Sequence, residues 1–240
     1  MISIPTFQSI VAKKKKSSSL SVSSFIPPII SGLLMQIDVN RPSSVWTDTT
    51  RTSPASVGNS VRGVTEFSGN NNHWSQATAV VAPTLQTSAG GKLVLRFAGS
   101  GTWYMLFASQ MTTIRTVYWV ANEDPAWGGG YQFLLGHSSN YQFHGDNPHG
   151  CFLSGTANVG LLHIDKTNVG IGTARPTTLK TITAQTNSDS TATEFSRDRN
   201  NAFGNRSWVG DLALLLVYSG VHTTQNMSDT EDAIKSYLSI

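Results

Sequence analysis

Residues 208–218 read Trp-Val-Gly-Asp-Leu-Ala-Leu-Leu-Leu-Val-Tyr, and from residue 212 onward this stretch is apolar without Gly or Pro. An unbroken apolar run of that length predicts a strand that is buried on both faces. Asp211, just before the run, is expected to serve a turn. The rest of the chain is therefore expected to cover this strand from two sides.

A short helix is predicted directly after this strand and a turn-rich break. Residues 228–238 read Ser-Asp-Thr-Glu-Asp-Ala-Ile-Lys-Ser-Tyr-Leu. Ser228 is the expected N-cap, and Glu231, three residues later, closes a capping box. Ile234, Tyr237 and Leu238 then share one face of the helix. We expect this amphipathic helix to pack back on the body of the protein.

The remaining composition favours β structure. Only 13% of the 240 residues are charged, well below the usual quarter. Apolar and β-branched runs recur at short intervals between turn residues, which indicates eleven or twelve strands. The main runs are residues 36–39, 61–67, 92–97, 103–108, 114–121, 131–135, 140–144, 159–165, 178–185, 194–197 and 212–218. The predicted fold class is all-β, an antiparallel β-sandwich with a short C-terminal helix.

The N-terminal part differs from the rest in charge and composition. Residues 1–35 are interpreted as an extended anchoring tail and linker, and residues 36–240 as the folded domain. The net charge of +3 comes from a run of four lysines, without which 13 basic residues face 14 acidic ones. The body therefore offers no broad basic surface for nucleic acid. The residues predicted to dock the tail on a partner are Ile4, Phe7, Ile10, Lys13, Lys14, Lys15 and Lys16.

Two other interpretations of the N-terminal part remain open. One is a solvated tail without a partner. The other is a secretory signal peptide, which is disfavoured because the lysine run comes late, Pro27 and Pro28 interrupt the apolar part, and no small-x-small site follows. The sequence contains no run of about 18 apolar residues, so no membrane-spanning helix is predicted. Cys151 is the single cysteine, so no intrachain disulfide is possible, and it is expected to be a small core residue.

Catalytic patterns are weak. A retaining glycosidase needs two nearby carboxylates, commonly at alternating positions of one strand. The chain has four glutamates and no Glu-x-Asp-x-Glu strand, and Glu123 and Asp124 are adjacent, so on a strand they would face opposite ways. A Ser-His-Asp arrangement stays open because these residues are common, although no Gly-x-Ser-x-Gly elbow is present. We therefore expect no enzymatic activity.

Metal binding is also weakly indicated. His144, Asp146 and His149 form a His-x-Asp-x-x-His pattern, which is not a standard zinc spacing. Polar loop residues with backbone partners are the favoured interpretation, so no metal site or cofactor is predicted. Ca²⁺ bound through Asp146 or Asp124 together with backbone carbonyls remains an open alternative.

A ligand site is predicted where aromatic residues adjoin glycine-rich loops. Aromatic faces beside polar side chains suit a sugar, whose C–H faces stack while its hydroxyls form hydrogen bonds. Trp127, in the loop, is the expected exposed platform. The alternative is that the strand aromatics are core residues of a hairpin. The candidate glycan-binding residues are Trp127, Tyr131, His137, Tyr141 and His144.

Four segments, in order along residues 36–240, resemble the concanavalin A-like, laminin-G-type jelly-roll domains. They are residues 61–76, with Ser-Gly-Asn-Asn-Asn-His-Trp-Ser-Gln at their end; 92–99, Lys-Leu-Val-Leu-Arg-Phe-Ala-Gly; 131–136 with 141–144; and 196–200 with the closing stretch 208–231. Ala98 and Leu214 depart from the family pattern, which often has Asp and Glu there. The resemblance implies a jelly roll, in a family that is mostly adhesive or sugar-binding.

These observations lead to two functional hypotheses. The first is a non-enzymatic virion surface protein of a tailed phage, a head decoration or fibre component assembled in the host cytoplasm. Its tail would dock on capsid or other virion proteins, and its jelly roll, as a homo-oligomer within the assembly, would face outward and bind host or environmental glycans. The alternative is a free carbohydrate-binding or adhesion module of a bacterial surface protein, located at the cell surface.

Overall fold

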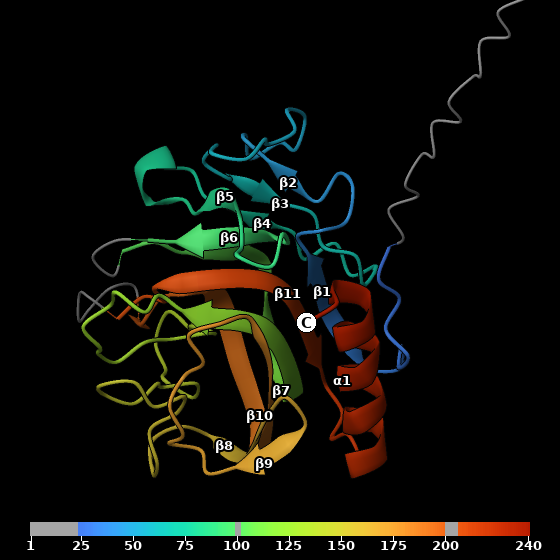
Figure 1. Ribbon diagram of the computed structural model, residues 1–240, viewed down its shortest axis with the longest axis vertical. Coiled ribbons are helices and arrows are strands. Elements are labelled where there is room, and N and C mark those ends of the chain that lie inside the picture. The colour runs from blue at the N-terminus through green and yellow to red at the C-terminus, as the bar shows by residue number, and fades with distance from the viewer. Residues whose placement is uncertain (1–23, 99–101, 200–205) are drawn as a thin grey trace, which may run out of the picture.

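The computed structural model describes residues 24–98, 102–199 and 206–240 (Figure 1). In these residues the chain forms one antiparallel sheet of eleven strands, which curves until it is nearly closed like a barrel, and one C-terminal helix. No helix among the described residues is long and apolar enough to cross a membrane. The residues predicted to dock the tail, Ile4, Phe7, Ile10, Lys13, Lys14, Lys15 and Lys16, lie outside the described residues.

The sheet is built around two long strands, β7 and β10. One path of neighbours runs β2-β3-β4-β7-β10-β8-β9, while β11 joins β7 to β1 and β6, and β5 pairs with β6. The elements are β1 (Leu33–Asp38), β2 (Val45–Trp46), β3 (Gly63–Val64), β4 (Trp74–Ser75), the 3-10 helix η1 (Ala79–Val81), β5 (Thr84–Thr87), β6 (Leu93–Phe97), β7 (Met105–Glu123), β8 (Val159–Ile164), β9 (Thr167–Val169), β10 (Lys180–Phe195), β11 (Gly210–Tyr218) and α1 (Thr224–Leu238).

The long strands correct the predicted strand pattern. Residues 103–108 and 114–121 were expected to be separate strands, as were 178–185 and 194–197. In the structure β7 and β10 run through the polar residues between them and pair with each other along most of their length. The register shifts between Gln185 and Ser190 and twice more before Glu194. Such irregularities bend and twist a strand, which lets both strands follow the curved sheet.

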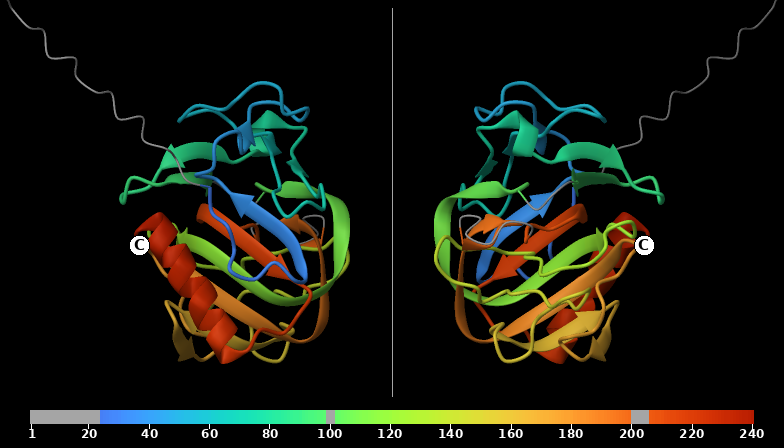
Figure 2. Two further views of the ribbon diagram at one scale, coloured as in Figure 1. Left: turned by 90° about the vertical axis from the view of Figure 1, so that its right-hand side faces the viewer. Right: turned by 90° about the vertical axis from the view of Figure 1, so that its left-hand side faces the viewer.

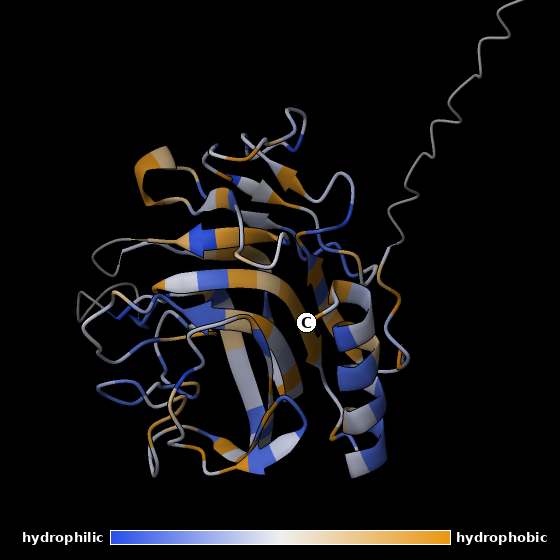
Figure 3. Ribbon diagram, viewed as in Figure 1, coloured by the Kyte–Doolittle hydropathy of each residue, from blue (hydrophilic) through white to orange (hydrophobic). Residues whose placement is uncertain are grey.

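The strand β11 is buried along its whole length, which confirms the prediction from the apolar run. Leu212, Leu215 and Val217 pack into the main core inside the curved sheet. Leu214 and Leu216 belong to a second apolar cluster beneath α1. Figure 3 shows the apolar colouring along most of β11, and the two views of Figure 2 show α1 lying on the outer side of the sheet.

Two predicted segments form less regular structure than expected. Of residues 61–67, only Gly63–Val64 form a strand, β3. Residues 131–135 and 140–144 do not form a hairpin but an irregular loop with one antiparallel bridge, between Phe133 and His144. The backbone of this loop is engaged elsewhere, since Gly136 bridges to Glu194 of β10 and Phe133 bridges to Ser207.

The helix α1 begins five residues earlier than the sequence indicated. Its N-cap is Thr223, whose hydroxyl accepts a hydrogen bond from the Asn226 N–H at 3.2 Å. The predicted capping box at Ser228 is therefore wrong. Glu231 is buried against the sheet, where it accepts a hydrogen bond from the Thr183 hydroxyl and lies 3.4 Å from His163 Nδ1. Ile234 and Leu238 are buried on the same side, as expected.

Replacing the two candidate caps separates these assignments. We expect Thr223→Ala to lower the free energy of unfolding by about 1 kcal/mol, because it removes the acceptor for an otherwise unpaired helix N–H. Ser228→Ala, inside the helix, should change it by less than about 0.5 kcal/mol. Urea denaturation of both variants is the measurement. A larger loss for Ser228→Ala would contradict the observed helix start.

The buried Glu231 makes stability depend on pH in a definite direction. Burial raises its pKa above the ordinary value of 4.5, although the Thr183 hydroxyl and His163 oppose the shift. The protonated carboxyl is therefore favoured in the folded state, and its contribution is lost as the pH rises through the folded-state pKa. Compared with Glu231→Gln, the wild type should lose unfolding free energy between pH 4.5 and pH 8. Denaturation of both proteins at the two pH values measures their unfolding free energies. A wild type that became more stable relative to Glu231→Gln as the pH rose would contradict the prediction.

Candidate functional site

Three of the five predicted ligand residues come together around His144. Its ring lies edge-on to Tyr131 at 5.0 Å and to Tyr141 at 6.2 Å between centroids, with Phe133 also at 5.0 Å. Phe133 and His144 are buried, whereas the Tyr141 side of the cluster reaches solvent, with 44% of that residue exposed. The predicted aromatic site is thus partly core and partly surface.

Two arginines complete this surface. The Arg206 guanidinium carbon lies 4.8 Å from the centre of the Tyr131 ring, and that of Arg199 lies 4.8 Å from the centre of the Tyr141 ring. Both arginines pair with the buried Asp198, Arg199 Nε at 2.7 Å and Arg206 Nη1 at 3.1 Å. The cation–π geometry and the shared carboxylate hold each ring beside a fixed planar donor group.

The side chains enclose a surface hollow of about 300 Å³. Burial lowers the pKa of His144, so this imidazole is neutral at pH 7. Its Nδ1 lies 2.7 Å from the Gly145 carbonyl, which can only accept, so Nδ1 carries the proton and Nε2 is an acceptor. We call this site the aromatic hollow; its lining residues are Tyr131, Tyr141, His144, Leu153, Thr156, Arg199 and Arg206.

The other two predicted residues lie apart from the aromatic hollow. His137 Nε2 is 3.1 Å from Gln110 Nε2, and His137 Nδ1 accepts from the Ser139 N–H at 3.0 Å. Trp127 was expected to be exposed but is half-buried, with its Nε1 enclosed. The turn that starts at Asp124 folds the indole ring back toward Gly130, which explains the correction.

Arg175 holds the loop that carries the aromatic hollow. It is buried with Glu123 at the end of β7, with both Nε and Nη2 2.8 Å from Oε1 of that carboxylate. Its remaining N–H groups donate to the carbonyls of Gly130, Pro148, Gly150 and Asp146 at 2.6–3.1 Å. One side chain therefore ties four points of the loop to the sheet. Its local sequence, Thr-Ala-Arg-Pro, contains no pattern that would have identified this role.

The residues considered for metal binding have other partners. His149 Nδ1 lies 2.8 Å from Glu123 Oε2, and Asp124 Oδ1 accepts from the Ala126 N–H at 2.9 Å. His144 faces the Gly145 carbonyl. In the described part of the chain, no three His, Cys, Asp or Glu side chains are grouped to hold a metal ion. Cys151 is buried, which confirms its expected place in the core, and burial raises its thiol pKa to about 12.

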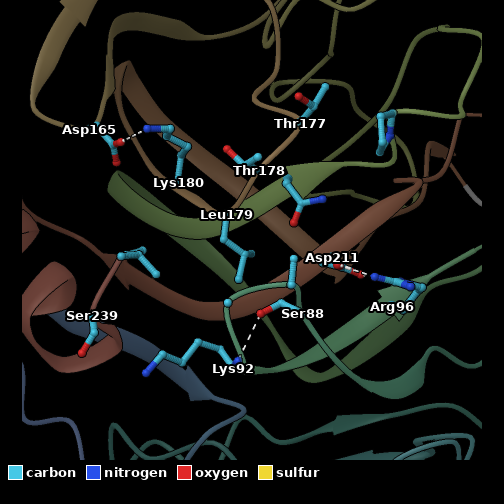
Figure 4. A pocket seen from close by; sticks show the side chains of 15 residues that line it. Ser88, Lys92, Arg96, Asp165, Thr177, Thr178, Leu179, Lys180, Asp211 and Ser239 are labelled. Atoms are coloured by element: carbon cyan, nitrogen blue, oxygen red, sulfur yellow. Dashed lines mark hydrogen bonds and ion pairs between the residues drawn. The ribbon is translucent and has the colours of Figure 1, made fainter.

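A larger cleft, of about 480 Å³, lies where the β5–β6 turn, the ends of β7, β10 and β11, and the C-terminal residues meet (Figure 4). Its apolar lining comes from Ala89, Pro125, Leu179 and Ile240, and its charged lining from Lys92, Arg96, Asp165, Lys180 and Asp211. The sequence suggested that Asp211 serves a turn. In the structure Asp211 lies in β11 and instead accepts hydrogen bonds from Nε and Nη2 of Arg96, both at 2.7 Å. We call this site the basic cleft. Sequence reasoning missed it because its residues come from separate segments.

Comparison with known proteins adds no assignment to either site. A scan against protein-family models, a search of curated proteins and a search of solved structures each found no match.

The role of Arg175 can be measured as stability. We expect Arg175→Met to cost about 3–5 kcal/mol of unfolding free energy, because it leaves Glu123 buried without its main partner. Urea denaturation is the measurement. The matched control is Lys166→Met, which breaks the exposed pair with Asp232 and should cost less than about 1 kcal/mol. Equal losses in the two variants would contradict the role given to Arg175.

Proposed function

We propose that this chain is a non-enzymatic glycan-binding protein of a virion surface. In this proposal the aromatic hollow takes the sugar, and the N-terminal residues anchor the protein to capsid or other virion proteins as a head decoration or fibre component. The observation that carries the glycan part is the grouping of two tyrosines, a neutral histidine and two arginines at one solvent-facing hollow.

The chemistry of the aromatic hollow supports a sugar as ligand. The exposed face of Tyr141 offers an apolar surface for sugar C–H groups. Around it, His144 supplies an acceptor, Thr156 a hydroxyl, and Arg199 and Arg206 planar donors. A small set of polar groups around an aromatic face is the usual composition of a ligand site.

We further propose that the sheet is a lectin-like jelly roll of the concanavalin A-like type. The support is the antiparallel pairing, the central β11 covered on both sides and the helix that follows it, together with the sequence resemblance. This architecture is used by adhesive and sugar-binding proteins, although a fold alone does not define a function.

The environment of the glutamates supports a function without catalysis. All four are buried, and each is held in a different cluster. Glu123 pairs with Arg175, Glu194 with Arg197, and Glu231 with Thr183 and His163. Glu66 accepts from the Gln36 N–H at 3.0 Å. A hydrolase of the two-carboxylate type needs two carboxyl groups that face one substrate cleft, and these four glutamates are instead held in separate clusters.

The virion part of the proposal is based on the charge division along the chain. Four consecutive lysines stand in the N-terminal part, while the rest carries 13 basic and 14 acidic residues. Such a basic segment suits docking on an acidic protein surface, leaving the nearly neutral body to face outward.

Binding to a glycan array tests the proposal directly. We expect the full-length protein to bind a defined subset of glycans, and Tyr141→Ala to weaken that binding about tenfold through loss of the stacking face. Tyr141→Phe keeps the face and should retain most of the affinity. Tyr104→Ala is the control for location, because Tyr104 also lies under an arginine, Arg197 at 3.7 Å, but outside the aromatic hollow.

Three outcomes would contradict the proposal. Absence of glycan binding, or binding unaffected by Tyr141→Ala, would exclude the aromatic hollow as the sugar site. For the virion part, deletion of residues 2–24 should abolish incorporation into particles. Incorporation of the shortened protein would exclude the N-terminal residues as the anchor. Glycan binding by the shortened protein, with no incorporation of the full-length protein into particles, would favour the alternative of a free carbohydrate-binding or adhesion module of a bacterial surface protein.

A further inference from the structure

The basic cleft has the size and lining of a small-molecule site. Its volume of about 480 Å³ falls in the range of ligand pockets, roughly 300–1,000 Å³. Leu179 lies at its centre in Figure 4, and Ala89, Pro125 and Ile240 add further apolar surface. A ligand with an apolar body would therefore bury apolar surface there.

Not every cation that lines the basic cleft is in an ion pair. Two of its three cations are paired, Arg96 with Asp211 at 2.7 Å and Lys180 with Asp165. The third, Lys92, is half-buried and has no carboxylate within ion-pair distance among the described residues. Among the charged side chains of the lining, three cations therefore face two carboxylates, and the cation left over is Lys92.

The positions of the charges give the basic cleft a direction. A smaller hollow of about 270 Å³ adjoins it and shares Arg96 and Asp211, and there Asp124 adds a second carboxylate. Asp211 and Asp124 thus lie at the Arg96 end, whereas Asp165 lies beside Lys180 on the opposite side in Figure 4. In Figure 4, Lys92 lies away from the Arg96 end, on the other side of Leu179. An anionic group would therefore be attracted to the Lys92 end.

We propose that the basic cleft binds a small amphipathic acid, a compound with an apolar body and one carboxylate or comparable anionic group. The apolar body packs on Leu179 and its neighbours, and the anion pairs with Lys92. This site is separate from the aromatic hollow and shares none of its residues. Its ligand would bind whether or not the protein recognises a glycan.

A matched pair of fluorescent probes tests this proposal on the full-length protein. The probes are 8-anilinonaphthalene-1-sulfonate and N-phenyl-1-naphthylamine, which have nearly the same apolar body, with and without the anion. We expect one saturable site for the sulfonate. Lys92→Gln should weaken its binding at least about tenfold, as expected for loss of a charge-assisted contact, while Lys92→Arg should retain it. The uncharged probe should bind more weakly and be insensitive to Lys92→Gln.

Further variants assign the binding to the basic cleft. Ala89→Trp, at an exposed position of the β5–β6 turn, should block the cleft and abolish saturable binding. Arg206→Gln removes a cation from the aromatic hollow and should have no effect on the probe. The proposal is overturned if Lys92→Gln leaves sulfonate affinity unchanged, if both probes bind equally, or if Arg206→Gln rather than Ala89→Trp removes the binding.

Discussion

The constraint on which the structure depends is the complete burial of β11. Its backbone pairs with β7 along one edge and with β6 and then β1 along the other, and its side chains enter two different apolar clusters. A strand in this position needs apolar residues at every step, because either face meets the interior. The sheet must curve around one face and α1 must cover the other, so both layers follow from this single run of seven apolar residues.

A second constraint fixes the irregular part of the molecule. The loop after β7 has little regular hydrogen bonding, and a buried backbone without partners would be costly. Arg175 adds donors to four carbonyls of this loop, two of which, those of Pro148 and Gly150, also accept from backbone N–H groups, while Glu123 neutralises its charge. The aromatic hollow is thus carried on a loop that is held by an ion pair rather than by strand pairing. This explains how Tyr131 and His144 are positioned without the hairpin that their sequence suggested.

The sequence was most informative where the physical signal was local. The apolar run predicted β11, and the clustering of aromatic residues near glycines predicted three members of the aromatic hollow. Prediction failed where polar residues continue a strand, as in β10, whose residues 187–189 are exposed but still lie between paired segments. It also failed for the helix start, because Thr223 and Ser228 are both good N-cap residues, and Glu231, three residues after Ser228, packs on the sheet instead of closing a capping box.

The basic cleft and the contribution of Arg199 and Arg206 to the aromatic hollow had no local signal at all. Arg206 reaches Tyr131 across 75 positions of sequence, and the cleft joins the β5–β6 turn to the C-terminal residues. Such sites exist only because the sheet closes on itself and brings loop ends together.

The two sites also differ in physical character. The aromatic hollow is bordered by ring faces and paired arginines, whereas the basic cleft combines an apolar floor with one lysine that lacks a carboxylate partner among the described residues. One curved sheet therefore presents two hollows of different chemistry, because each is assembled from separate segments that the same fold brings together.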